Sequence, residues 1–139
     1  MELNKYSKTI TLDPTQPAAQ AMFYGIGLTD EDLETIVEQG IAICTDLSHL
    51  ILSANYTKNN VLEMYTKLVD ETKHLHLAGA SGIDGEGLYF NNLAPDELIM
   101  FKLALKTKHA KVLEVWQGHL DNFEGFKLGI KQLSEVSHG

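Results

Sequence analysis

The run His74-Leu75-His76-Leu77-Ala78 decides how the rest of the sequence is interpreted, because it is a short segment rich in β-forming residues. Similar runs occur at three other places, namely 9–12, 41–45 and 111–116. The four runs start at residues 9, 41, 74 and 111, so their starts lie 32, 33 and 37 residues apart. A strand–helix–strand unit takes roughly 30 residues, so the spacing indicates a repeated strand–helix module.

Helical patterns lie between these runs. Residues 29–39 begin with an acidic segment close to a capping box and end at a glycine. Asn60 is placed to cap a second helix, and Pro95 begins a third, with acidic residues in its first turn. A fourth helix is expected over 126–136. The alternation βαβαβαβα predicts an α/β fold with a parallel sheet.

The composition sets the general class of the protein. The chain has 139 residues, a net charge of −8 and one cysteine. We expect one domain over 1–139, with residues 1–8 disordered and no internal disulfide, in a reducing cytoplasm. The acidic balance argues against a nucleic-acid partner, and no apolar run reaches the roughly 18 residues of a membrane span.

Ionisable residues occur at or near the carboxyl ends of the predicted strands, where α/β folds build sites. Because strand side chains alternate in direction, Asp46, His76 and Glu114 are expected to meet at one mouth. Such a group suits Mn²⁺, Co²⁺, Mg²⁺ or Zn²⁺. Each residue also has a structural explanation: the aspartate could accept backbone hydrogen bonds in a turn, and one histidine of the pair could be a core residue. The glutamate is the sharpest signal, because an unpaired buried carboxylate is unfavourable.

Other polar residues carry weaker signals. The glycine-rich stretch 79–87 has no lysine and is not a P-loop; it is either a flexible loop or a loop over the site whose amides hold a ligand. We interpret Cys44 as a small buried apolar residue. We interpret three further residues as surface or packing residues: Tyr56, His109 and His138.

Several of these motifs resemble a known superfamily. The segments 46–49 and 74–78, with Glu114 on the last strand, resemble the xylose-isomerase-like TIM barrels, which include sugar-phosphate isomerases and epimerases. The segments 80–88 and 114–126 resemble the barrels sometimes fused to sialic-acid-synthase-like proteins. The similarity extends over residues 40–135. It implies a parallel (βα)4 half of a TIM barrel, completed by a second copy in a homodimer or by a separate amino-terminal half-barrel.

The resemblance also implies residue roles. The metal ligands would be Asp13, Asp46, His76 and Glu114, with Asp13 standing where the relatives usually have glutamate. Glu114 would be the general base, and His49 would lie near the substrate oxygens or the metal. Substrate contacts are assigned to Glu86, Trp116 and His119.

Three functions follow as hypotheses. The first is a metal-dependent sugar or sugar-phosphate isomerase or epimerase of carbohydrate metabolism, acting by enediolate proton transfer. The alternative is a catalytically inactive sugar-binding or assembly module derived from that barrel. Cleavage of abasic DNA ranks third, because it would need more histidines and a cationic groove.

Overall fold

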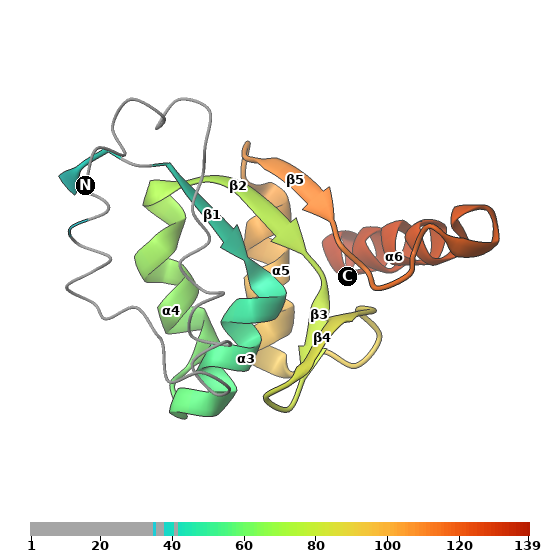
Figure 1. The fold of residues 1–139 in the computed structure, drawn as a ribbon, viewed down its shortest axis with the longest axis horizontal. Helices are drawn as coiled ribbons and strands as arrows, with labels where there is room; N and C mark the ends of the chain where they lie inside the picture. The colour runs from blue at the N-terminus through green and yellow to red at the C-terminus, as the bar shows by residue number, and fades with distance from the viewer. Residues whose placement is uncertain (1–34, 36–37, 41) are drawn as a thin grey trace.

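The structure is a computed structural model and describes residues 35, 38–40 and 42–139 (Figure 1). Its elements in chain order are β1 (Ile43–Asp46), α3 (Leu47–Thr57), α4 (Val61–Leu68), the 3-10 turn η1 (Val69–Glu71), β2 (Thr72–Leu77), β3 (Gly79–Ser81), β4 (Gly85–Leu88), α5 (Pro95–Lys106), β5 (Ala110–Leu113) and α6 (Leu120–His138). The predicted α/β class is confirmed.

The main sheet has three parallel strands in the order β1-β2-β5. Its register pairs Cys44 with His74 and Asp46 with His76, and His76 with Val112 on the other side. A second sheet is the antiparallel hairpin β3-β4, which follows β2 directly and extends beyond the end of the main sheet (Figure 1). The described residues therefore hold three of the four predicted parallel strands, and neither the half-barrel nor its partner is shown.

The core lies between the main sheet and its helices. Leu75 and Leu77 project from β2 into a cluster of buried side chains contributed by α3, α4, α5 and α6. Phe101 of α5 has no exposed surface and packs edge-on against Phe90, with ring centroids 5.2 Å apart. Removal of this apolar surface from water is the main favourable term that holds the sheet against its helices.

Two predicted helices are confirmed together with the residues that start them. The Asn60 side chain caps α4 by accepting a hydrogen bond from the Glu63 amide at 3.0 Å. Helix α5 starts at Pro95, and the Glu97 carboxylate accepts from the Ala94 amide at 2.9 Å. Both helices therefore begin where local capping chemistry satisfies otherwise unpaired amides.

Two elements were not predicted. Helix α3 occupies residues where the sequence indicated only a site, and the β3-β4 hairpin occupies the glycine-rich stretch, which is therefore not a flexible loop. The predicted fourth helix lies inside α6. That element starts with a kink, because residues 121–123 have left-handed backbone angles, with φ between 50° and 64°.

Some predictions fall outside the described residues. These are the disordered segment 1–8, the strand 9–12, the ligand Asp13 and most of the helix 29–39. Of that helix, Thr35 and Glu38 are described and helical. Among the helices that the structure describes, none has the length and apolar character needed to cross a membrane.

Candidate metal centre

Three predicted ligands come together at the carboxyl end of the main sheet. Asp46 ends β1, His76 lies beside it on β2, and Glu114 follows β5. One ligand atom from each lies within 4.8 Å of the others. His76 Nδ1 is 2.8 Å from Glu114 Oε2 and 3.7 Å from Asp46 Oδ2. Parallel register thus places two carboxylates around one imidazole, a donor set of the kind that holds divalent cations.

His49 connects this group to the hairpin. Its Nδ1 lies 3.2 Å from Asp46 Oδ2, and its Nε2 lies 2.8 Å from Glu86 Oε2. The ring is mostly buried, whereas 55% of the Glu86 side chain is exposed. Carboxylates on both ring nitrogens fix the orientation of the imidazole.

The start of α3 fixes these side chains locally. Asp46 is the N-cap of α3, because its Oδ1 accepts a hydrogen bond from the His49 amide at 3.1 Å. This aspartate therefore does have the structural role in a turn that the sequence allowed for. Its other carboxylate oxygen, Oδ2, is the atom that faces His49 and His76. One residue thus serves both the helix start and the candidate site.

Ser48 holds the hairpin against α3. Its hydroxyl donates to the Gly79 carbonyl at 3.0 Å and accepts from the Gly87 amide at 3.1 Å. The Gly87 carbonyl in turn accepts from the Trp116 amide at 2.8 Å. Gly87 has a φ of +70°, and a Cβ there would lie 3.2 Å from the Cβ of Trp116. These bonds place Glu86 over the site, and the sequence analysis did not identify Ser48.

A pocket of about 770 Å³ opens beside the candidate ligands. Its wall includes six of the predicted site residues: Asp46, His49, Glu86, Glu114, Trp116 and His119. Trp116 is 69% exposed. No lysine is among the described residues that line the pocket, and the whole sequence has no arginine. Its wall therefore carries carboxylates without a lysine or arginine to balance them.

His74 lies two residues before His76 on β2, on the side away from the carboxyl end of the strand. Its ring centroid is 5.2 Å from that of His76. Burial lowers the pKa of His74 below its usual value, the charge of His76 lowers it further, and Glu114 acts in the opposite direction. The ring is therefore biased towards the neutral form, which is the form that binds metals. Cys44 is the partner of His74 in the strand register, but the sequence analysis interpreted it only as a buried apolar residue and did not combine it with the histidines.

The fold and the candidate site thus describe an α/β protein with a carboxylate–imidazole group at the ends of parallel strands. No family model matches the chain, and no solved structure matches it. Several curated relatives match a short part of it. The dihydroxy-acid dehydratase of Lactococcus lactis subsp. cremoris (strain MG1363) is 74% identical over 34 residues, which are 24% of this chain and 6% of the relative.

Two further relatives carry the same enzyme name. The dihydroxy-acid dehydratase of Flavobacterium psychrophilum is 77% identical over 31 residues, which are 22% of this chain and 6% of the relative. The mitochondrial dihydroxy-acid dehydratase of Schizosaccharomyces pombe is 51% identical over 43 residues, which are 31% of this chain and 7% of the relative. The chain therefore spans only about 6% of the length of the first relatives it matches.

These matches correct the sequence interpretation. The resemblance to xylose-isomerase-like TIM barrels was wrong, and so were the sugar isomerase or epimerase function and its place in carbohydrate metabolism, because the matched relatives are named dihydroxy-acid dehydratases. The alternative, an inactive sugar-binding or assembly module from that barrel, is not favoured either.

The physical reason for the error lies in the motifs. Asp46 is needed as a helix cap whatever the chemistry, and any parallel sheet gathers polar residues at its carboxyl ends. Short motifs of this kind therefore report the architecture and do not identify a family.

Proposed function

We propose that this chain carries a divalent-metal site that acts in the dehydration of a small dihydroxy acid. The observation that carries the proposal is the convergence of Asp46, His76 and Glu114 beside a pocket. The name of the matched relatives supplies the reaction class, removal of water from a dihydroxy acid. Since the chain spans a small part of those relatives, their substrate is part of this proposal.

The residues present fit a divalent cation. Two carboxylates and one imidazole are mixed oxygen and nitrogen donors, and Mn²⁺, Mg²⁺, Co²⁺ and Zn²⁺ all accept such sets. His76 Nδ1 and Glu114 Oε2 lie 2.8 Å apart, and a cation bound between them would replace this direct contact. When bound, the cation supplies positive charge for the carboxylate and hydroxyl oxygens of the substrate.

The charge of the pocket supports the need for that cation. Asp46, Glu86 and Glu114 line the pocket without a lysine among the described lining residues. A substrate carboxylate would be repelled by these groups in the absence of a neutralising ion. We therefore expect substrate binding to depend strictly on metal.

His49 and Glu86 are our candidates for moving the proton. In the dehydration, the C–H bond next to the substrate carboxylate breaks, and Glu86 accepts its proton. The 2.8 Å contact with His49 lets the pair share that proton. The C–O bond at the neighbouring carbon breaks, the pair returns the proton to the departing hydroxyl, and water leaves. The remaining enol rearranges to a 2-oxo acid.

The outer pocket wall is assigned to the substrate. Trp116 and His119 belong to that wall, and Trp116 offers an exposed ring for the hydrocarbon end of the molecule. In this scheme Glu114 is a ligand and does not carry the proton.

Closure of the polar face of the sheet by a second copy of the chain, or by an amino-terminal half-barrel, is part of this proposal. Val112 on this face is 44% exposed, and β5 is an edge strand within the described residues. Such an edge offers unpaired backbone groups to another chain. Light scattering at several concentrations would show a defined dimer, and a monomer at high concentration would contradict the homodimer.

Metal binding and product formation test the function together. We would titrate Mn²⁺ into the wild-type chain and into His76→Ala and Glu114→Gln, and follow 2-oxo acid formation from a short-chain 2,3-dihydroxy acid. We expect affinity for Mn²⁺ to fall at least about tenfold in both variants, since each loses a ligand. 2-oxo acid formation should fall in parallel.

The matched control is His109→Ala, which changes a histidine outside the pocket wall. It should bind Mn²⁺ as the wild type does. Equal metal binding by wild type and both ligand variants would remove the site. Metal binding without any 2-oxo acid would remove the dehydration and leave the metal site in place.

A further inference from the structure

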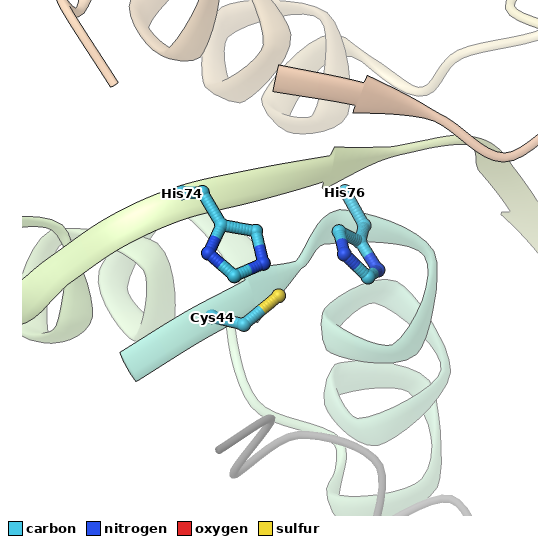
Figure 2. A group of neighbouring side chains, drawn as sticks. All are labelled: Cys44, His74 and His76. Carbon is cyan, nitrogen blue, oxygen red and sulfur yellow. The ribbon is translucent and has the colours of Figure 1, made fainter. Parts of the chain in front are cut away.

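A second group of ligating side chains lies on the same face of the main sheet. Cys44 on β1 and His74 and His76 on β2 offer one sulfur and two nitrogen atoms, all within 4.8 Å of one another. Figure 2 shows both imidazole rings projecting from β2 towards the side chain of Cys44. We propose that these three residues form a binding site for a thiophilic divalent cation of the Zn²⁺ type, distinct from the carboxylate set.

The strand register explains why these side chains meet. Cys44 and His74 are direct partners across β1 and β2, whose backbones lie about 4.8 Å apart in any sheet. His76 lies two residues further along β2 and therefore projects from the same face. The site is thus built on two hydrogen-bonded strands in the middle of the fold, and its donors are held on rigid elements.

The distances suit tetrahedral zinc after small side-chain movements. Zinc–sulfur and zinc–nitrogen bonds of about 2.3 and 2.0–2.1 Å place neighbouring donors about 3.4–3.6 Å apart. The donors here are within 4.8 Å of one another, so each pair closes by at most about 1.4 Å through side-chain rotation. Three protein donors leave the fourth position open for a water molecule or a small ligand.

The donor types separate this site from the first one. Thiolate and imidazole favour Zn²⁺, whereas carboxylates favour Mg²⁺ and Mn²⁺. Cys44 is 3% exposed, so water cannot stabilise its thiolate. A bound metal ion would stabilise the thiolate instead. His76 belongs to both groups, and the two sites therefore compete for its ring. The inference goes beyond the proposed function, because Cys44 and His74 take no part in that function.

Cobalt is the probe for the first test, since Co²⁺ replaces Zn²⁺ and reports thiolate ligation by a charge-transfer absorption in the near ultraviolet. The wild-type chain should take up one Co²⁺ with this absorption. Cys44→Ser and His74→Asn should lose it or require at least about tenfold more Co²⁺. Glu114→Gln is the matched control, because it removes a ligand of the first site and none of the three ligands of this one, and it should keep the absorption.

The results separate the two sites. If Glu114→Gln loses Mn²⁺ binding and keeps the cobalt–thiolate band, both assignments stand. If the band persists in Cys44→Ser, or the wild type binds no Co²⁺ through sulfur, this inference is overturned whatever happens to Mn²⁺.

A second measurement needs no substitution and so does not depend on the folding of a variant. X-ray absorption of the zinc-loaded wild-type chain should show one sulfur neighbour at about 2.3 Å and nitrogen neighbours at about 2.0–2.1 Å. A first shell of nitrogen and oxygen only would overturn the site.

Discussion

The two faces of the main sheet have different roles: one packs against the helices, and the other carries the candidate metal ligands. One face places Leu75 and Leu77 against the helices, and both are almost fully buried. The other face carries Cys44, His74, Asp46 and His76, with Glu114 just beyond β5. Period-two alternation is therefore what keeps core packing and ligating groups apart in one short sheet. Substitutions on one face should change stability, and substitutions on the other should change metal binding.

The largest expected effect is on the helix-covered face. Phe101→Ala removes a side chain with no exposed surface and leaves a cavity against Phe90. We expect it to lower the free energy of unfolding by about 3–5 kcal/mol, measured by urea denaturation. Val112→Ala is the control from the polar face, where 44% exposure predicts a change within about 0.5 kcal/mol. Equal losses in the two variants would contradict the division between the faces.

An intermediate effect is expected at Asp46, where the two roles meet. Asp46→Ala removes the cap of α3 and should lower the free energy of unfolding by about 0.5–2 kcal/mol. Asp46→Asn keeps an equally good cap and should leave stability close to wild type. Both variants should lose Mn²⁺ affinity in a titration, because both remove the carboxylate charge. Wild-type metal binding by the asparagine variant would show that Asp46 is only a cap.

The smallest expected effect on stability is at Tyr65 in the core. The Tyr65 hydroxyl is buried and makes no hydrogen bond within the described structure. Tyr65→Phe should therefore raise the free energy of unfolding by about 1 kcal/mol, since it removes an unpaired polar group.

The same residue predicts a pH effect. Burial raises the pKa of Tyr65 above 10.0, so the unfolded chain ionises at a lower pH than the folded one. The free energy of unfolding is therefore unaffected below about pH 10 and falls as the pH rises from there through the folded pKa. The phenylalanine variant should lack this alkaline loss, so its advantage in urea denaturation should grow above pH 10. A constant difference between pH 7 and 11 would show that the hydroxyl reaches water.

Local signals explain how much of the fold was predictable. Asn60 and Pro95 act within their own helix starts, so α4 and α5 could be placed from sequence alone. Helix α3 contains the apolar run 50–52, which a buried strand could equally well contain, and so the pattern did not distinguish the two. The β3-β4 hairpin depends on bonds from Ser48, some 31 and 39 residues away from its partners, which no local pattern reveals.

The candidate site divides in the same way. Alternation within strands and the order of the elements were enough to bring Asp46 and His76 together. Glu114 joins them, but the prediction that it is a buried residue of the last strand was wrong, because it lies just beyond β5 with 45% of its side chain exposed. The position of Glu86 depends on the hairpin, and its contact with His49 therefore appears only in three dimensions. The family was misjudged because helix capping and sheet topology alone account for motifs as short as 46–49 and 74–76.

The junction between β1 and α3 has a consequence for chain length. Asp46, Ser48 and His49 lie within one helical turn, and each has a different partner on another element. One inserted residue between 46 and 48 would rotate everything after it by about 100°, turning the serine away from the hairpin and the imidazole away from Glu86. The exposed hairpin tip at 82–84 is bonded to α3 through the Asn55 side chain, which donates to the Gly82 carbonyl at 2.6 Å, and this bond does not orient a site residue. Natural length variation in this protein should therefore accumulate at the tip and be absent at the junction.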